Sequence, residues 1–509
     1  MKYILAHDLG TSGDKAALYD FKGRLTAFSV KSYPTVYPMP SAVEQNPLDW
    51  WDAVCASTQA LLKDNKIDPH DIACITFSGQ MMGCVLVDSA GEVLRNAIIW
   101  ADSRGQKQEL FMKAQLNPHD FYHITGHRPA AFYSLAKLLW VKDNEPKLYK
   151  KAYKMLNAKD YIVYRLTGEF VTDYSDASST NLFDIRNKSW SGKIIDAMGI
   201  RPDLLPQLCT SLDVIGRGLT EEAAKATGLK KGTTVVIGGG DGSCAAAGAG
   251  AVQEGSAYVV IGTSSWISKA SRSPVFDAEM KTFNWVALDP GYYTPCGTMQ
   301  AAGYSVSWLK DTLCDAEKQE AKGRDVSIYS IIDEKIIQSP PGADNLLFLP
   351  YLLGERSPRW NANAKGAFIG LTMTSTKNDM MRSVLEGVGY NLKVILDIIE
   401  QENPVEHIRA IGGGAKSMAW LQILADVWQK PIEVPDYLEE ATSLGAAVCA
   451  GTAIGVFSGF DTVNSFNRSV KIIHPNRNNA DSYQRLYTMF NRVYNALEDS
   501  FGAWPTLLQ

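Results

Sequence analysis

Short apolar, β-branched runs alternate along the chain with long stretches of helical periodicity, and this alternation most constrains the fold. Each run has the length of a buried strand, and each intervening stretch is long enough for a helix. The pattern therefore predicts an α/β protein. We expect strands at residues 3–7, 72–77, 233–237, 258–261, 346–349 and 408–411.

Two of the helical stretches carry clear signals. In NPLDWWDAVCASTQALLK, Asn46 is expected to cap a helix whose first position is Pro47. The stretch DMMRSVLEGVGYNLKVILDIIEQ, from Asp379, keeps an apolar stripe for several turns. Both should form amphipathic helices that lie on a sheet.

A strand, a Gly-Thr-Ser turn and a second strand occur twice, about 250 residues apart, in ILAHDLGTSGDKAALYD and in YVVIGTSSWISKA. Such a repeat indicates two similarly built halves that present their turns to a common cleft. Gly-Thr-Ser is also a common turn tripeptide, so the motif alone does not establish a repeat. We expect domains at residues 1–248 and 249–509, with a hinge region at 245–256.

Length, charge and cysteine usage favour a protein that binds small molecules. The 509 residues, 46% of them hydrophobic, exceed what a single core usually holds. The formal net charge is −5 and the basic residues are scattered, so we expect no nucleic-acid or anionic-membrane partner. The eight cysteines include no C-x-x-C pair, which is typical of reduced thiols and predicts a cytoplasmic protein.

One uncharged segment, residues 441–460, has the length of a membrane helix. Glycine, serine and threonine dilute its hydrophobicity. We therefore expect a helix of small residues that packs closely against a sheet.

The first glycine-rich turn, Asp8-Leu9-Gly10-Thr11-Ser12-Gly13, has the composition of an anion-binding loop. Glycines let a ligand approach the backbone closely. The backbone N–H groups, together with the Thr11 and Ser12 hydroxyls, form a concavity that suits phosphate. Lys15 adds a positive charge. The sequence G-x-x-x-x-G-K-[ST] is absent, so a nucleotide here requires another architecture. A plain surface β-hairpin is the alternative.

The second glycine-rich segment, VVIGGGDGSCAAAGAG, delivers Asp241 from the end of a buried strand to the start of a helix. Acids at that end of a strand face the place where α/β sheets bind ligands. Residues 240–245 also fit a loose G-x-G-x-x-A. A dinucleotide fold would need an acid about 20 residues further on, and the strand there ends in YVVIGTSS. A dehydrogenase is therefore disfavoured.

The third glycine-rich segment, IRAIGGGAKSMAWLQILADVW, places a glycine triplet between a strand and a helix that opens near Ser417. It could form a bed for a nucleoside or a plain strand-to-helix turn. Together the three segments fit phosphoryl transfer, which needs positioned phosphates, a base and Mg²⁺. We expect Asp241 to be the base and Asp8 to organise Mg²⁺ and its waters, although either aspartate could be a cap or turn residue.

These residues resemble the FGGY carbohydrate kinase family, which belongs to the actin, hexokinase and Hsp70 ATPase superfamily. FYSLAKLLWVKDN, at 132–144, fits the first family signature and GAFIGLTMTSTKNDMMRSVLE, at 366–386, fits the second. The resemblance covers nearly the entire chain. It implies two ribonuclease-H-like domains that close on a sugar and Mg-ATP, with the active site in the cleft between them.

The resemblance also implies roles for individual residues. Asp241 would be the general base, and Asp8 and Asp241 would lie at the metal. The phosphates and the nucleotide would contact Gly10, Thr11, Ser12, Lys15, Gly262, Thr263, Gly303, Ser307, Gly413, Gly414 and Ser417. The sugar would contact Met81, Met82, Trp100, Asp102, Arg104 and Phe132.

Among the subfamilies, PYLLGERSPRWNANAKGAFIGL is most similar to the xylulokinases, which implies phosphorylation of D-xylulose to D-xylulose 5-phosphate. Two departures exist: xylulokinases usually carry histidine where this chain has Met82, and asparagine where it has Gly242. The loss of two hydrogen-bonding groups could redirect the enzyme to another ketose, a polyol or a sugar acid, of the ribulose, glycerol, erythritol or gluconate type.

A rival class is a non-catalytic sugar or ATP sensor on a kinase scaffold. Such proteins usually append a further module, for which we expect no room in this chain. The expected partners are therefore a small sugar and ATP, and a homodimer stays open.

Overall fold

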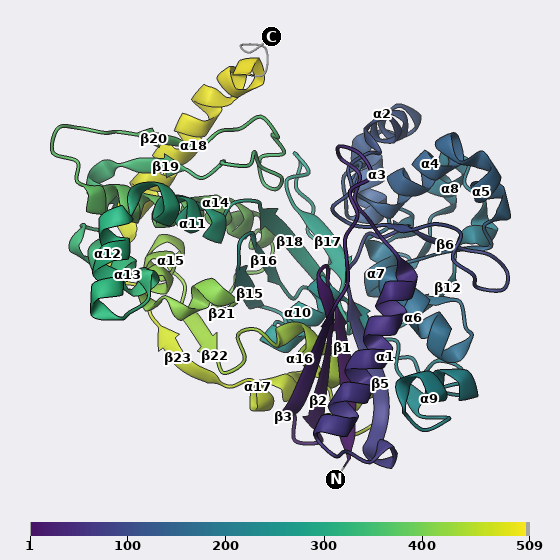
Figure 1. The fold of residues 1–509 in the computed structure, drawn as a ribbon. Coiled ribbons are helices and arrows are strands. Elements are labelled where there is room, and N and C mark those ends of the chain that lie inside the picture. The colour runs from purple at the N-terminus through teal and green to yellow at the C-terminus, as the bar shows by residue number, and fades with distance from the viewer. Residues whose placement is uncertain (1, 505–509) are drawn as a thin grey trace.

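The computed structural model describes residues 2–504 and contains two halves, each built around its own sheet (Figure 1). All six strands expected from the sequence are present, as β1, β5, β13, β15, β19 and β21. Helices pack against both sheets, which confirms the predicted α/β class.

The N-terminal sheet has the strand order β13-β5-β1-β2-β3, and β14 also pairs with β5. Its strands are β1 (Tyr3–Leu9), β2 (Gly13–Asp20), β3 (Leu25–Ser32), β5 (Ile72–Gly79), β13 (Thr234–Val235) and β14 (Gly239–Gly240). β1 and β14 both run parallel to β5, with Asp8 opposite Ser78 and Gly240 opposite Gly79. The residues that end β1 and follow β14 therefore meet at the carboxyl edge of one sheet, where α/β proteins bind ligands.

The C-terminal sheet has the order β17-β18-β16-β15-β21-β22-β23. Its strands are β15 (Ser256–Ile261), β16 (Ser265–Lys269), β17 (Phe283–Val286), β18 (Tyr293–Met299), β21 (His407–Ile411), β22 (Ile432–Pro435) and β23 (Ser469–Ile473). β15 and β16 form an antiparallel hairpin, and β21 runs parallel to β15. β1, β2 and β5 have the same arrangement in the other sheet. The two Gly-Thr-Ser motifs thus occupy equivalent hairpins, as the repeat predicted.

Small elements complete the N-terminal half, most of them in the blue region at the upper right of Figure 1. The strands are β4 (Glu44–Gln45), β6 (Val85–Val87), β7 (Ala97–Ile98), β8 (Lys154–Leu156), β9 (Val171–Asp173), β10 (Phe183–Asp184), β11 (Ser189–Trp190) and β12 (Gln207–Cys209). The helices are α1 (Pro47–Asp64), α2 (Gln106–Gln115), α3 (Pro118–Thr125), α4 (Ser134–Asn144), α5 (Pro146–Lys151), α6 (Ala158–Thr167), α7 (Tyr174–Ser178), α8 (Gly192–Met198) and α9 (Glu221–Thr227).

The C-terminal half adds a small hairpin and a set of helices. The hairpin consists of β19 (Leu347–Leu349) and β20 (Ala367–Ile369). The helices are α11 (Gly303–Leu313), α12 (Asp315–Arg324), α13 (Ile328–Gln338), α14 (Lys377–Ile399), α15 (Met418–Trp428), α17 (Val463–Phe466) and α18 (Ala480–Ala503). The long α14 is buried along most of its length and forms the centre of this half's core.

The expected helix boundaries agree closely with the structure. The side chain of Asn46 accepts a hydrogen bond from the backbone N–H of Leu48 at the start of α1. Ser417 caps α15 by accepting from the N–H of Trp420. α14 begins two residues before the expected Asp379, because Thr376 and Asp379 form a capping box across its first turn.

Two helices of small residues join the halves: α10 (Asp241–Ala249) and α16 (Ala441–Ala453). Their backbones touch, since a Cβ added at Gly248 would lie 1.8 Å from the carbonyl oxygen of Ala441. A Cβ at Gly445 would lie 1.9 Å from the carbonyl oxygen of Cys244. Figure 1 shows both helices between the two sheets, and α16 packs on β1 and β5. The expected small-residue helix against a sheet is thus confirmed, although it ends at Ala453.

The expected hinge at 245–256 is helical in its first part, because α10 continues to Ala249, where its buried alanines pack against α16. Only residues 250–255 form a link to β15. Across residues 2–504, no helix has the length and apolar character needed to cross a bilayer. The eight cysteines all lie in this range and are all free thiols.

Candidate active site

Asp241 is the first residue of α10 and directly follows β14, at the carboxyl edge of the N-terminal sheet. Its Oδ1 accepts a hydrogen bond of 2.7 Å from the backbone N–H of Gly242. Burial, followed by the negative charge of Asp8, raises the pKa of Asp241 to about 7. A carboxylate with a pKa near neutrality suits a general base, because it can both accept and release a proton.

Asp8 is the penultimate residue of β1, which lies on the other side of β5 from β14, and it is held by the other half of the molecule. The hydroxyl of Thr442, in α16, donates to Asp8 Oδ2 at 2.7 Å. Burial raises the pKa of this carboxyl group as well. Asp8 and Asp241 thus both lie at the carboxyl edge of the N-terminal sheet, Asp8 near the end of β1 and Asp241 directly after β14, two strands that each pair with β5.

The first turn, between β1 and β2, is closed by a hydrogen bond from the Gly10 N–H to the Gly13 carbonyl oxygen, at 3.0 Å. Thr11 and Ser12 are exposed at its tip. The indole N–H of Trp100 donates to the Thr11 hydroxyl at 2.8 Å. The ammonium group of Lys15 lies 3.3 Å from Glu440 Oε1, so this cation bridges to the C-terminal half.

The second turn, between β15 and β16, is supported by the start of α11. The Gly262 N–H donates to the Ser264 carbonyl oxygen, and the Gly303 N–H donates to the Gly262 carbonyl oxygen at 2.9 Å. A Cβ at Gly303 would lie only 2.4 Å from that oxygen. Glycine is therefore required for α11 to begin this close to the turn.

A cavity of about 670 Å³ adjoins the second turn. It is lined by all seven residues expected in the C-terminal half: Gly262, Thr263, Gly303, Ser307, Gly413, Gly414 and Ser417. Tyr329 and Asp333 of α13 and Trp420 of α15 also line it, and Ser417 Oγ donates to Asp333 Oδ1 at 2.7 Å. No glycine motif marks α13, so its contribution left no signal in the sequence. The volume suits a nucleoside.

Replacing Gly303 with alanine is expected to weaken nucleotide binding, because the new Cβ must push α11 away from the second turn. We expect the KM for ATP to rise about tenfold, with the KM for the sugar nearly unchanged, since misplacement of a binding element is costly. Steady-state kinetics with each substrate varied in turn measure this. Gly192→Ala, at a site with no atom within 4 Å of the new Cβ, is the control. An unaltered KM for ATP in Gly303→Ala would contradict the assignment.

The expected sugar residues fall into two groups. Met81 and Met82 follow the carboxyl end of β5, and a Cβ at Gly240 would lie 2.6 Å from Met81 Cγ. Met82 has a φ of 61°, with its N–H bonded to Ser179 Oγ and its carbonyl oxygen bonded to the Lys137 ammonium. These contacts bring the methionine pair next to the residues that present Asp241.

Asp102 and Arg104 form a buried pair. Asp102 accepts hydrogen bonds from the N–H of Val43 and from the Arg104 guanidinium, the latter at 2.8 Å. Arg104 also lies 2.8 Å from Glu44 Oε1. In this structure both side chains are thus engaged with protein partners, and any sugar contact has to share those groups.

Phe132 contacts a segment of the C-terminal half that the sequence did not single out for the site. The Arg356 guanidinium lies 4.2 Å from the centre of the Phe132 ring. The Trp360 ring stacks on the Phe132 ring, with 6.3 Å between the two ring centres. Within residues 2–504, Arg356 Nε has no hydrogen-bond partner. A cation and an aromatic ring from the opposite half thus extend the expected sugar wall.

Two carboxylates, Asp8 and Asp241, fit a Mg²⁺ ion that keeps several waters and is shared with phosphates. Among the described residues no group of three or more His, Cys, Asp or Glu side chains could hold a metal.

Comparison with known proteins agrees with this geometry. The model of the FGGY family of carbohydrate kinases, N-terminal domain, matches residues 3–248, and that of the C-terminal domain matches 257–454. The xylulose kinase of Bacillus subtilis is 34% identical over 504 residues, covering 98% of both chains. The gluconokinase of Bacillus licheniformis is 32% identical over 501 residues, covering 98% of this chain and 97% of its own.

Solved structures give the same result. The ligand-bound xylulose kinase from Lactobacillus acidophilus superimposes with a TM-score of 0.92 at 30% identity, covering 99% of this chain and 100% of that one. Both family domains and nearly the full length are matched. The chain therefore belongs to the FGGY family of carbohydrate kinases and is an ATP-dependent sugar kinase.

Proposed function

We propose that the protein transfers the γ-phosphoryl group of Mg-ATP to a hydroxyl of D-xylulose, giving D-xylulose 5-phosphate. The placement of Asp241 carries this proposal. The carboxylate shares a sheet edge with the first turn and stands at the start of α10, the helix that packs against α16 from the other half. An acceptor hydroxyl beside Asp241 would lie between the phosphate turns of the two halves.

The ionised Asp241 accepts the proton of the attacking hydroxyl, so that the oxygen can attack the γ-phosphorus in line with the leaving oxygen. The N–H groups of Gly10 and Gly262 close the two turns, and the other backbone N–H groups of residues 10–13 and 262–264, with their hydroxyls, stabilise the phosphate charge from fixed positions. Asp8 and Asp241 would hold Mg²⁺ through its waters, and the ion supplies charge neutralisation of the phosphate oxygens. Closure of the two halves excludes water and so limits hydrolysis of ATP.

D-xylulose is proposed first because the sequence around Gly354-Glu355-Arg356 resembles xylulokinases and xylulose kinases are among the most similar relatives. Trp285 accounts for one of the two departures. A Cβ at Gly242 would lie 2.5 Å from Cζ3 of the Trp285 ring, so this indole occupies the space that an asparagine side chain would need. The packing of Trp285 therefore accounts for the glycine at position 242, and this departure from the xylulokinase pattern does not require a different substrate.

A sugar acid is the second candidate. Gluconokinases are similar to this chain at nearly the same identity as xylulose kinases. Arg356 and Lys137 place two cationic groups beside Phe132 and Met82, where a substrate carboxylate could be bound. Burial lowers the pKa of Lys137 to about 7, so its charge near neutrality depends on a nearby anion.

Sugar-dependent ADP release, measured over D-xylulose, D-ribulose, glycerol, erythritol and gluconate, tests the proposal. We expect the highest kcat/KM with D-xylulose. A higher value with gluconate would replace the substrate but keep the kinase. If no sugar raises ADP release above the sugar-free rate while ATP and sugar still bind, the sensor alternative is supported instead.

A further inference from the structure

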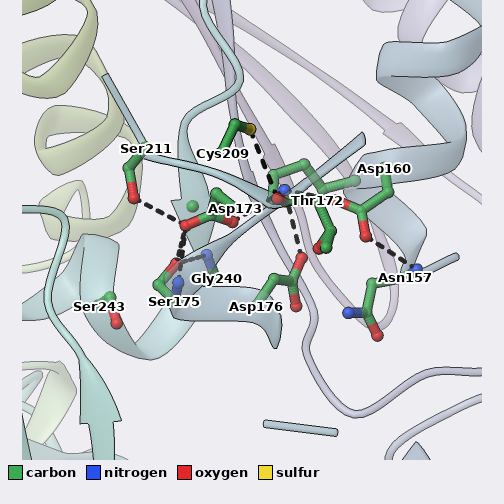
Figure 2. Close-up of polar contacts among 12 residues, drawn as sticks. Asn157, Asp160, Thr172, Asp173, Ser175, Asp176, Cys209, Ser211, Gly240 and Ser243 are labelled. Carbon is green, nitrogen blue, oxygen red and sulfur yellow. Dashed lines mark hydrogen bonds and ion pairs between the residues drawn. The ribbon is translucent and has the colours of Figure 1, made fainter. Parts of the chain in front are cut away.

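A buried polar cluster lies directly behind the strand that presents Asp241. Its members, all less than 5% exposed, are Asn157, Lys159, Asp160, Asp173, Ser175, Asp176 and Ser211. Figure 2 shows the carboxylate of Asp173 between Ser175 and Ser211, with Gly240 beside Ser175. No role in phosphate, sugar or nucleotide binding has been assigned above to any of these residues.

Ser175 connects this cluster to the backbone of the catalytic strand. The N–H of Gly240, the residue before Asp241, donates to Ser175 Oγ at 2.9 Å. Ser175 Oγ in turn donates to Asp173 Oδ2. The roles of the Ser175 hydroxyl are therefore fixed. It donates its proton to the Asp173 carboxylate and accepts the hydrogen bond from the Gly240 N–H.

Asp173 is itself fixed by several donors. Its Oδ2 accepts from Ser211 Oγ at 2.7 Å and from the backbone N–H of Ser175 at 2.9 Å, which caps α7. Its Oδ1 lies 3.0 Å from the ammonium group of Lys159. The buried charge of Asp173 is thereby compensated, as buried carboxylates require.

Lys159 is the only cation in direct contact with the cluster's acids, as far as residues 2–504 are concerned. It lies 2.6 Å from Asp160 and 3.4 Å from Asp176. Burial alone would lower the pKa of Lys159, but the three carboxylates raise it well above its usual value, so the lysine stays charged. Burial also raises the pKa of the Asp176 carboxyl group well above its usual range.

The short helix α7 and the residue after it make equivalent contacts to two other parts of the site. Ser179 Oγ accepts from the N–H of Met82, on the expected sugar side, at 3.2 Å. Ser178 Oγ accepts from the N–H of Val286, in the C-terminal sheet, at 3.2 Å. Three serine hydroxyls therefore hold three backbone segments that converge on Asp241.

We propose that Ser175, oriented by the Asp173–Lys159 pair, is a positioning residue that holds the backbone of Gly240 and so aims the Asp241 carboxylate at the acceptor hydroxyl. This inference rests on the proposed role of Asp241 as base. Without the hydroxyl, the buried N–H of Gly240 has no acceptor, and the junction of β14 and α10 shifts to find one. Because the shift displaces the base and leaves the substrate pockets in place, the rate falls more than binding.

Ser175→Ala in the full-length protein tests this. We expect kcat to fall about ten- to a hundredfold while the KM values for sugar and ATP change less than about twofold, as expected for displacement of a reacting group. Thr180→Ala is the matched control, because Thr180 is equally buried and follows the same helix. Its hydroxyl donates to the carbonyl oxygen of Ala177 and does not contact Gly240. The control should show a similar loss of thermal stability with kcat nearly unchanged.

Equal kcat losses in Ser175→Ala and Thr180→Ala, or none in either, would overturn the proposal in favour of a purely structural role. If Ser175→Ala does not fold, Ser175→Thr and Ser175→Cys decide the question: threonine keeps the hydroxyl and should retain kcat, whereas the weaker thiol acceptor should lose it. Equal kcat in these two variants rejects the inference. Full activity in Asp241→Asn would instead reject the proposed base, so the two failures are distinguishable.

Discussion

Asp241→Asn is expected to lower kcat for sugar-dependent ADP release by about a thousandfold or more, the upper part of the range for loss of a general base. The amide has the shape of the carboxylate but cannot accept the proton of the acceptor hydroxyl. Nucleotide binding should survive, because the cavity residues lie in the other half of the protein. Coupled-enzyme kinetics and ATP titration of the same preparation measure both. Wild-type turnover in this variant would refute the role of Asp241.

The same substitution should stabilise the free protein. Burial and Asp8 raise the pKa of Asp241 from 3.8 to about 7, so between these values the folded state keeps a proton that the unfolded state has lost. The free energy of unfolding of the wild type therefore falls as the pH rises through this window. After allowance for partial solvent access, Asp241→Asn should gain about 1–3 kcal/mol at pH 8 and less at pH 5. Urea unfolding without Mg²⁺ and ATP at both pH values tests the sign.

Gly248→Val is expected to destabilise the protein by about 4 kcal/mol or more, which is exceptional for one substitution. The Cβ of the new side chain would lie 1.8 Å from the carbonyl oxygen of Ala441, and backbone cannot move aside as a flexible side chain can. α10 and α16 would have to separate, and with them the two halves. Thermal unfolding and the soluble fraction on expression measure the effect.

The control for this prediction is Gly323→Val, in α12, where a Cβ meets nothing within 4 Å. Both substitutions place valine within a helix, so their difference isolates the helix crossing. A similar, small loss of stability in the two variants would show that α10 and α16 tolerate separation.

The sequence predicted the elements whose signals are local. Asn46 and Ser417 cap helices because their side chains contact only the next few backbone N–H groups, and the six strands follow from apolar runs. The glycine turns were equally visible. The seven expected nucleotide residues of the C-terminal half line one cavity because six of them lie where a strand gives way to a turn or helix, and Ser307 lies one turn into α11.

The parts that were not predicted depend on contacts between distant segments. Ser175 and Gly240 are separated by 65 positions, and nothing near either residue indicates that they meet. The resemblance implied a sugar contact for Asp102 but not its bonds within the protein, where its carboxylate accepts from Val43 and Arg104. Arg356 reaches Phe132 from the other half of the chain. Such pairs have no periodicity or composition that a linear pattern can reveal.

The position of α16 on β1 and β5 has a consequence for synthesis of the protein on the ribosome. The apolar face formed by Ile4, Ala6, Cys74 and Val236 is covered by residues of the 441–453 helix and the turn after it, including Leu444, Val448 and Phe457. A nascent chain that has completed its first sheet must therefore keep that face uncovered until nearly nine-tenths of the polypeptide has emerged. We expect an isolated fragment of residues 1–248 to aggregate, and the full chain to depend on chaperones during translation.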